Sequence, residues 1–365
     1  MPRILILGGY GNAGLHIARL LRQETQAALI LAGRSQQKAE AAAAPLHATA
    51  RRVDAADPHS LAQALEGVDL LVNASSTIHY TASIAEAAIQ ARADYFDIQL
   101  SSPRKWDVLR RLLPRIHAAK RCFLTDGGYH PGMPAALIRY AAAHLDTVRS
   151  AIASSVMRLP WRTFRFSPES VAEFTQELRE YRPLYYSGGR WRQSWSQTRL
   201  VDFGPPWSVQ RCAPMALEEL HELPEKLAGL EETGFYANAF DGFTSNLVIP
   251  LGVLIVNYLP AGTSLFERLF LWSAQRFADP PFAVVLEVDV EGMRNGQPRR
   301  MRLRVEHHDA YFFTAVPAVA CLLQYLDGSV RRPGLSCQAN AVEPERFYHD
   351  LARLGLRTGS AVPAA

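Results

Sequence analysis

The first third of the chain alternates short apolar runs with segments in which apolar residues recur at helical spacing. The runs are rich in Leu, Ile, Val and Ala, which is typical of strands buried on both faces of a parallel sheet. Short links between runs and helical segments predict an α/β domain with a Rossmann-type, doubly wound parallel sheet. The predicted strands are Arg3–Leu7, Ala28–Ser35, Ala48–Asp54, Asp69–Ser75, Tyr95–Ile98 and Arg121–Thr125.

The pattern changes from about residue 150. Residues 283–291 alternate apolar and polar side chains, as in a strand with one buried face, and a turn with Asn295-Gly296 follows them. A second hairpin is predicted around Gly188-Gly189. We therefore expect a first domain at 1–134, joined by returning C-terminal helices at about 311–357. The second domain, at 135–310, is expected to be α+β and built on a mostly antiparallel sheet.

A glycine-rich turn follows the first predicted strand and precedes a segment with helical periodicity. A Gly-x-Gly-x-x-Gly pattern in this context is the fingerprint of a dinucleotide-binding turn. The glycines let the backbone approach a pyrophosphate, whose charge meets the amides at the helix N-terminus. The turn consists of Gly9, Tyr10, Gly11, Asn12, Ala13 and Gly14.

The end of the second predicted strand indicates which dinucleotide binds. NAD-dependent enzymes place Asp or Glu there to hold the ribose 2′-hydroxyl, whereas this chain has Arg34 and Ser35. A guanidinium can bind a 2′-phosphate through two hydrogen bonds, so NADP(H) is favoured. The alternative is that Arg34 is an exposed residue at the start of the next helix.

Other strand ends complete the predicted cofactor site, because ligands bind beyond the carboxyl ends of strands in open α/β sheets. Asp54 ends the third strand, from which its side chain could reach the adenine. Asn73, Ala74 and Ser75 end the fourth strand, where the nicotinamide is expected.

Composition and charge narrow the class of protein. The chain has 365 residues, 48% of them hydrophobic, and a net charge of +4 without a basic stripe, so no nucleic-acid partner is expected. The start Met1-Pro-Arg runs directly into the first strand and leaves no room for a signal peptide, which favours the cytoplasm. Scattered cysteines without a Cys-x-x-Cys pair indicate neither a disulfide framework nor a metal site. They are Cys122, Cys212, Cys321 and Cys337.

Further stretches, spread over most of the chain, share residue types and spacing with one enzyme family. They are Val68–Ala74, Ala93–Asp97, Gly127–Pro134, Phe166–Val171, Ser187–Trp191, Glu306–Ala315 and Gly328–Gly334. Together with the glycine turn, they resemble the saccharopine dehydrogenase-like family of NADP-dependent reductases. Two features depart from that family: Gly188 stands where its hairpin has Asp, and Asn246–Phe277 is more apolar than an amino-acid reductase would require.

The resemblance implies an NADP(H)-dependent oxidoreductase whose first domain binds the cofactor and whose second domain serves substrate binding and dimerisation. It implies a small-molecule substrate, a homodimer, and hydride transfer to or from a C=N bond of an imine or secondary amine. The apolar stretch keeps a conjugated C=C bond open as the acceptor. The competing class is a non-catalytic dinucleotide-binding or lipid-surface-associated scaffold.

Three residues are candidates for the chemistry. His130 lies in a Gly- and Pro-rich loop after the sixth strand and could be a general acid near neutral pH. Tyr95 and Asp97 lie two residues apart on one predicted strand and so share a face. The structural alternatives are that Asp97 braces a loop and that His130 packs against Pro131.

The apolar stretch at 246–277 is open to two interpretations. Its first run, residues 247–256, is broken by Pro250 and Gly252 and is too short to span a bilayer, which needs about twenty residues. We favour a buried core or dimer helix. The alternative is an amphipathic segment that rests on a membrane surface or admits a lipid-like substrate.

Overall fold

A computed structural model describes residues 1–163, 174–176 and 178–361. By its contacts the chain divides into two compact units, residues 1–136 with 311–356 and residues 137–310 with 357–365. The predicted helix at Phe166–Val171 lies outside the described residues.

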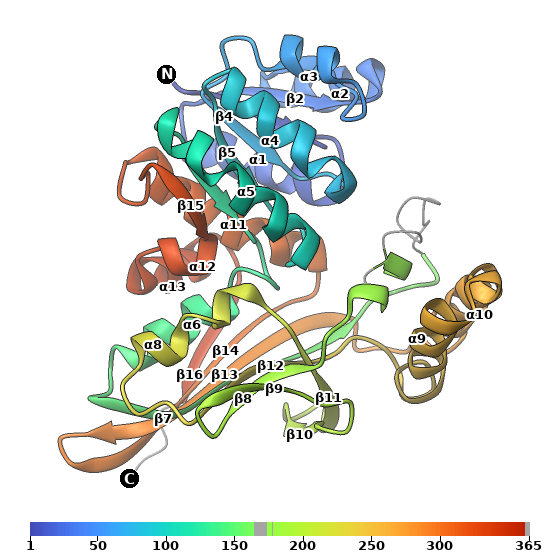
Figure 1. Cartoon of the computed structure of the whole chain (residues 1–365), viewed down its shortest axis with the longest axis vertical. Coiled ribbons are helices and arrows are strands. Elements are labelled where there is room, and N and C mark those ends of the chain that lie inside the picture. The colour runs from blue at the N-terminus through green and yellow to red at the C-terminus, as the bar shows by residue number, and fades with distance from the viewer. Residues whose placement is uncertain (164–173, 177, 362–365) are drawn as a thin grey trace. The chain divides into compact units, whose positions relative to one another are not determined.

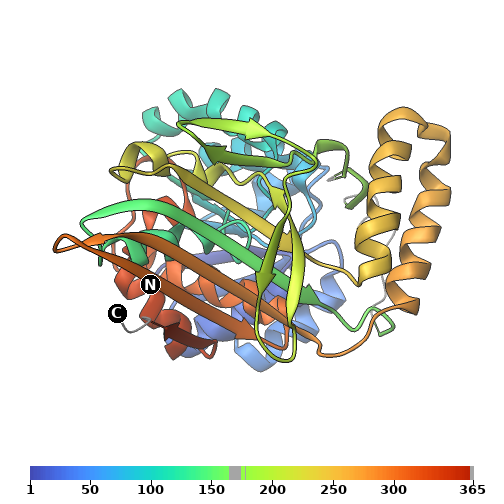
Figure 2. The same ribbon diagram turned by 90° about the horizontal axis from the view of Figure 1, so that it is seen from below.

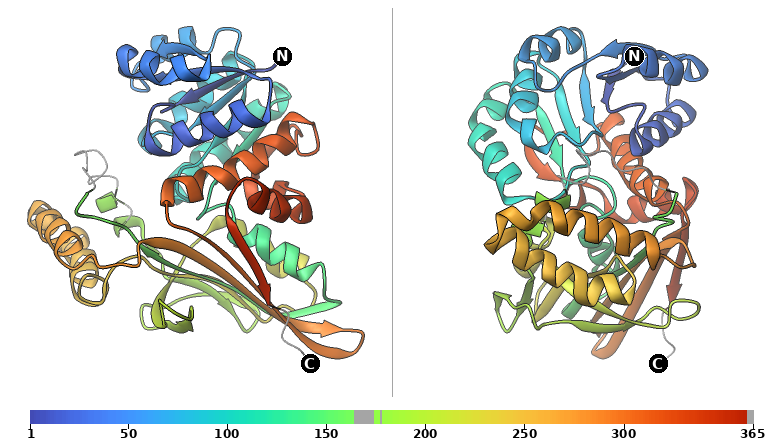
Figure 3. Two further views of the ribbon diagram at one scale, coloured as in Figure 1. Left: turned by 180° about the vertical axis from the view of Figure 1, so that it is seen from behind. Right: turned by 90° about the vertical axis from the view of Figure 1, so that its right-hand side faces the viewer.

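The first unit contains a seven-stranded sheet in the order β15-β6-β5-β4-β1-β2-β3. Every neighbouring pair is parallel, so the predicted Rossmann-type α/β fold is confirmed. Helices cover both faces, with α3, α4 and α5 on one side and α1 and α11 on the other (Figures 1 and 3). The strands are β1 Arg3–Leu7, β2 Ala28–Gly33, β3 Thr49–Arg52, β4 Leu70–Asn73, β5 Asp94–Asp97, β6 Cys122–Thr125 and β15 Gly334–Cys337.

Apolar faces of these helices pack on the sheet and exclude water from it. The buried cluster joins residues of β1, β2, β4, β5 and β6 to residues of α3, α4 and α5. This packing fixes the carboxyl ends of the strands, which carry the predicted site. The helices are α1 Asn12–Glu24, α2 Gln36–Ala43, α3 Pro58–Ala64, α4 Thr81–Gln90, α5 Pro103–Ala118, α11 Ala310–Leu326, α12 Gln338–Ala341 and α13 Pro344–Arg353, with short 3₁₀ turns at Ala44–Leu46 and Ile78–Tyr80.

The second unit is built on a nine-stranded sheet whose main path is β10-β11-β12-β7-β13-β14-β16, with β8 paired to β12 and β9 paired to β8 (Figure 2). Only the β12–β7 pair is parallel, so the predicted mostly antiparallel sheet is confirmed. The strands are β7 Thr147–Arg158, β8 Leu184–Ser187, β9 Arg190–Gln193, β10 Arg199–Asp202, β11 Val209–Met215, β12 Glu232–Asn238, β13 Ala283–Arg294, β14 Gln297–His307 and β16 Arg357–Ala361.

Helices α9 and α10 form a hairpin beside this sheet (Figures 2 and 3). The stretch expected to be a buried core or dimer helix is therefore a helical pair, and part of its apolar surface is exposed. The helical elements of this unit are α6 Pro134–Ala142, α8 Leu223–Lys226, α9 Ile249–Tyr258 and α10 Thr263–Arg276, with a π-helical turn at Thr244–Val248 and 3₁₀ turns at Glu218–Leu220 and Pro260–Gly262.

Candidate functional site

The glycine-rich turn between β1 and α1 has a backbone that only glycine fits. A Cβ at Gly14 would lie 2.2 Å from the Gly8 carbonyl oxygen, and a Cβ at Gly9 would lie 2.9 Å from that of Ile6. Helix α1 begins at Asn12 with no side-chain cap and no acidic residue in its first turn. Its first amides and its positive end therefore suit an anion, which fits the pyrophosphate of a dinucleotide.

Tyr10 connects the turn to the end of β2. Its hydroxyl accepts a hydrogen bond from the Ser35 amide at 3.0 Å. Its ring covers Gly33 so closely that a Cβ there would lie 2.6 Å from the ring. Arg34 is exposed at this end, and no carboxylate occurs between residues 33 and 38. The sheet edge beside the glycine turn thus carries positive rather than negative charge.

Asn73 orders the loop after β4. Its fully buried side-chain oxygen accepts hydrogen bonds from the hydroxyls of Ser75 at 2.8 Å and Thr77 at 3.2 Å. The Ala74 carbonyl oxygen lies where a Cβ at Gly8 would meet it at 2.7 Å. The predicted residues Asn73, Ala74 and Ser75 therefore lie against the glycine turn.

Asp54 lies away from this group, beyond the outermost strand β3. Its side chain accepts a hydrogen bond from the Ala56 amide at 3.0 Å, and its own amide donates to the Ser60 hydroxyl at 3.0 Å. The carboxylate shapes a local turn, and its contact with an adenine stays a prediction.

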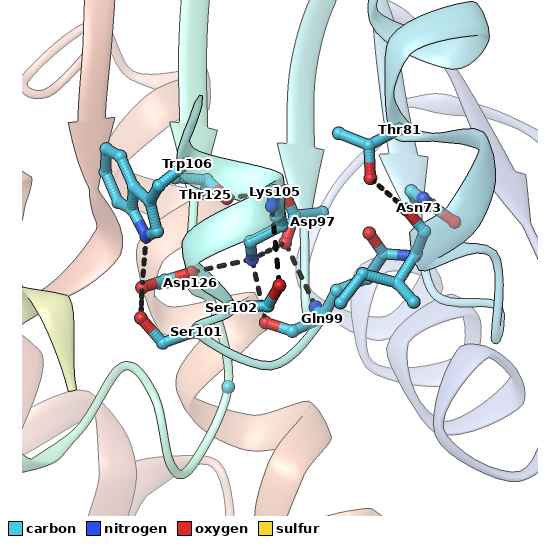
Figure 4. A network of polar contacts seen from close by, with 12 residues as sticks. Asn73, Thr81, Asp97, Gln99, Ser101, Ser102, Lys105, Trp106, Thr125 and Asp126 are labelled. Atoms are coloured by element: carbon cyan, nitrogen blue, oxygen red, sulfur yellow. Dashed lines mark hydrogen bonds and ion pairs between the residues drawn. The ribbon is translucent and has the colours of Figure 1, made fainter. Parts of the chain in front are cut away.

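A buried ionic network occupies the carboxyl ends of β5 and β6 (Figure 4). The Lys105 Nζ atom of α5 lies 3.0 Å from the Asp97 carboxylate and 2.6 Å from the Asp126 carboxylate. All three side chains have no exposed surface. Asp97 was predicted from the sequence, whereas Lys105 and Asp126 were not.

Neutral donors surround the two carboxylates. Asp97 accepts a hydrogen bond from the Thr125 hydroxyl at 2.6 Å and another from the backbone amide of Gln99 at 3.0 Å. Asp126 accepts from the Ser101 hydroxyl at 2.6 Å and from the Trp106 indole at 3.1 Å. The network therefore ties the loop after β5 to the first turns of α5 and to β6.

Gln99 extends this network to the loop after β4. Its side-chain amide nitrogen donates to the Ser75 carbonyl oxygen and to the Thr77 hydroxyl, both at 3.2 Å. The backbone carbonyl oxygen of Gln99 accepts from Lys105 Nζ at 3.0 Å. Three adjacent strand ends are thereby held as one rigid edge.

The electrostatics of the network act on the pKa values of Asp126 and Lys105. Two carboxylates face one ammonium, so the cluster carries an excess of negative charge when both are ionised. Burial raises the pKa of Asp126, and the Asp97 charge adds to this, although Lys105 opposes both. Burial alone would lower the pKa of Lys105, but the two carboxylates outweigh it and raise that pKa. Lys105 is therefore protonated throughout the neutral range.

Tyr95 lies beneath the site, within the core. Its ring stacks on Phe123 with ring centres 5.1 Å apart, and the residue has no exposed surface. Burial, with the nearby Asp97 charge, raises the pKa of its hydroxyl well above the ordinary value. Such a group holds its proton at neutral pH, and its position favours a structural role.

His130 follows β6 in a tightly held loop. Its ring stacks on Tyr129 at 4.0 Å, and the Gln338 side chain bonds both the amide and the carbonyl of Gly128. Burial lowers the pKa of His130 to about 4. The imidazole is then neutral near pH 7, which does not favour the expected general acid.

Within the described residues, no group of three or more His, Cys, Asp or Glu side chains is arranged to hold a metal ion. The four cysteines are buried and form no disulfide. None of the helices in the described ranges combines the length and apolar run needed to cross a bilayer.

These features define a dinucleotide-binding unit with a polar, preorganised edge beside its glycine turn. Residues 4–121 match the family model described as the saccharopine dehydrogenase NADP binding domain. Carboxynorspermidine synthase of Vibrio cholerae is 22% identical over 344 residues, which span 84% of this chain and 81% of that protein. Its counterpart in Vibrio alginolyticus has the same identity and coverage.

A solved structure supports the same relationship at the level of fold. Apo saccharopine dehydrogenase (L-Glu forming) from Saccharomyces cerevisiae is similar over 99% of this chain and 100% of its own, with a TM-score of 0.71 and 15% identity. The chain therefore resembles the saccharopine dehydrogenase-like oxidoreductases in its NADP-binding domain and shares the saccharopine dehydrogenase fold, and the domain match supports a nicotinamide dinucleotide as cofactor. The resemblance read from the sequence is confirmed.

Proposed function

We propose that the protein is an NADP(H)-dependent reductase of C=N bonds, acting on a protonated iminium and releasing a secondary amine. When bound, NADPH would supply a hydride to the iminium carbon. The C=N π electrons become the nitrogen lone pair, so the carbon gains one hydrogen and the nitrogen loses its charge. The sum is iminium plus NADPH giving amine plus NADP⁺.

The NADP(H) preference rests on the end of β2. Arg34 is exposed there, Tyr10 covers Gly33, and no carboxylate is present to repel a 2′-phosphate. Arg34 would hold that phosphate, and the glycine turn would hold the pyrophosphate.

The C=N preference rests on the state of the two expected acids. His130 is neutral near pH 7, and both oxygens of buried Asp97 already accept hydrogen bonds from protein donors. A conjugated C=C bond needs a proton donor after hydride addition, whereas an iminium arrives already protonated. Saccharopine and carboxynorspermidine, the compounds in the names of the relatives, are also secondary amines.

In this proposal the network of Lys105, Asp97 and Asp126 has a positioning role. It holds the loops at the ends of β5 and β6 in one geometry, against which a nicotinamide ring could lie. Its excess negative charge also favours a cationic substrate over a neutral one. The three residues would touch neither hydride donor nor acceptor.

Substrate class is tested by following NADPH oxidation with two panels. The first contains amine and carbonyl pairs that form imines in solution, and the second contains enoyl compounds. We expect turnover with the first panel and a secondary amine by mass spectrometry. Turnover with enoyl compounds alone would contradict the C=N assignment.

Cofactor choice is tested by titrating NADPH and NADH against wild type and Arg34→Ala. Losing a bidentate charged contact removes about 1.5–3 kcal/mol, so NADPH affinity should fall at least tenfold while NADH affinity changes little. Arg19→Ala, an exposed arginine on α1, is the matched control. Equal affinity of wild type for the two cofactors would refute the preference.

A further inference from the structure

The α9–α10 hairpin exposes an unusual amount of apolar surface. Tyr258 is 77% exposed and Leu265 is 67% exposed, and several further large apolar side chains accompany them. Monomeric soluble proteins rarely leave such groups contiguous, and a patch of this kind marks an interaction surface. The exposed set is Phe243, Leu247, Leu251, Leu254, Tyr258, Leu259, Leu265 and Trp272.

The exposed leucines are not needed for the hairpin's own core. On α9 the opposite side is buried, and Gly252 packs so closely on Phe266 that a Cβ would lie 2.1 Å from its ring. Val256, Phe266 and Phe270 belong to a buried cluster that also includes Val248 and Ala274. The hairpin therefore folds around one apolar face and keeps a second apolar face outside.

Four large apolar residues that are exposed on α9 and on the π-helical turn before it form one stripe. Leu247, Leu251, Leu254 and Tyr258 are spaced by four, three and four residues, which places them on a single side of a helical segment. On α10, Leu265 and Trp272 share a side in the same way. Phe243, which precedes α9, contacts Trp272 of α10 with ring centres 6.4 Å apart.

The most exposed charges between residues 242 and 277 are positive. Between residues 242 and 277, the exposed charged side chains are those of Arg268 and Arg276. Glu267 is only partly exposed, and it accepts a hydrogen bond from the Thr175 hydroxyl at 3.1 Å. Just beyond this range, the exposed Asp279 lies 3.9 Å from Arg162, whose guanidinium donates to the Gln275 and Arg276 carbonyl oxygens, so the exposed charges around the hairpin keep a positive excess.

We propose that the hairpin docks on the surface of an anionic phospholipid bilayer. Leucines would enter the boundary between headgroups and acyl chains, and Tyr258 and Trp272 are of the residue types that favour that depth. Arg268 and Arg276 would meet lipid phosphates, each adding attraction to a negative surface.

Charge decides between a bilayer and a second copy of the chain. In a twofold dimer the same patch meets itself, so each copy would bring the same positive excess, from Arg162, Arg268 and Arg276 against Asp279, to the interface. Anionic headgroups supply the missing negative charge. Helix α9, at ten residues, is about 15 Å long and cannot span a hydrocarbon core of about 30 Å, so the hairpin lies on the surface.

Flotation of the full chain with vesicles tests the proposal. We expect binding to phosphatidylcholine vesicles that contain phosphatidylglycerol, and weaker binding without it or at high salt. Leu254→Glu should lower the vesicle partition coefficient at least tenfold, and Arg268→Gln with Arg276→Gln should lower it about tenfold on anionic vesicles. Leu200→Glu is the matched control, because Leu200 is 66% exposed on β10 outside the hairpin.

Tryptophan fluorescence gives a second measurement on folded protein. A blue shift on vesicle addition should occur in wild type and be reduced in Trp272→Phe, with thermal unfolding unchanged in both. Wild type that stays in solution with both kinds of vesicle overturns the proposal. So does equal binding by Leu254→Glu, or a wild-type dimer that Leu254→Glu dissociates in sedimentation velocity.

Discussion

Replacing Lys105 with Met provides the sharpest test of the buried network. The substitution keeps an unbranched side chain as far as Cε but removes the only ammonium within reach of the Asp97 and Asp126 carboxylates among the described residues. Breaking a fully buried pair costs about 3–5 kcal/mol, because the remaining charge is left without compensation. Here two carboxylates remain, so we expect Lys105→Met to lie at the upper end of that range.

The structure also predicts how the loss can be relieved. Adding Asp126→Asn removes one of the two facing charges, while the Ser101 and Trp106 donors can still bond the amide oxygen. The double variant should therefore be more stable than Lys105→Met alone, by about 1–3 kcal/mol. Lys120→Met, an exposed lysine in the same unit, should change stability by no more than about 0.5 kcal/mol.

Urea titration followed by far-ultraviolet circular dichroism measures these differences. The pH dependence of the free energy of unfolding gives a second test, because its direction is predicted. Because the pKa of Lys105 is raised, its stabilisation is complete below the unfolded value of about 10.4 and is lost as pH rises through the folded pKa. Lys105→Met should lack this alkaline loss. Equal unfolding midpoints for Lys105→Met and wild type, or additive losses in the double variant, would refute the reasoning.

Other substitutions test the remaining parts of the first unit. Gly14→Ala should abolish detectable dinucleotide binding in equilibrium titrations, because its methyl group would lie 2.2 Å from a carbonyl oxygen, whereas Gly359→Ala, with nothing within 4 Å, should bind as wild type. Asp94→Asn should lower the free energy of unfolding by about 1.5–3 kcal/mol, because buried Asp94 accepts from three donors, while loss of the half-exposed Arg331 should cost about 1 kcal/mol or less in the same denaturant titration. His130, with its pKa lowered to about 4, should give the kcat profile no inflection near neutral pH, and wild type should lose stability relative to His130→Gln as pH falls from about 6.5 toward 4. An inflection near pH 6.5 that His130→Gln removes would contradict the last expectation.

Local sequence patterns predicted the first sheet well but not completely. Strands β1, β2 and β4 are apolar runs between turns, whereas β3 and β5 contain charged residues and were predicted from their place in the alternating pattern. The glycine turn has the spacing of its class. Strand β15, Gly334–Cys337, was not predicted, because four residues of mixed polarity give no periodic signal. Its partner β6 lies about two hundred residues earlier, so only the folded sheet reveals the pair.

The apolar stretch at 246–277 illustrates a different limit. Its residue types predict helices with little polar surface, and α9 and α10 are such helices. The sequence does not indicate which apolar side finds a partner within the chain. That depends on contacts such as Gly252 on Phe266, which leave Leu254 and its neighbours outside.

Residue type and strand position singled out Asp97, as a candidate acid or as a residue that braces a loop, but did not indicate its partners. Lys105 reads as an ordinary solvent-exposed lysine in a helical segment, and only folding brings it to a carboxylate eight residues earlier. Asp126 could have been found, because it directly follows β6, just as Asn73 and Asp97 end their strands. The same position that suggests an acid also places Asp97 under a loop, where its protein donors occupy both oxygens. The solvent accessibility and the proton affinity of a side chain distinguish a proton donor from a structural residue. Both depend on how the folded site is packed.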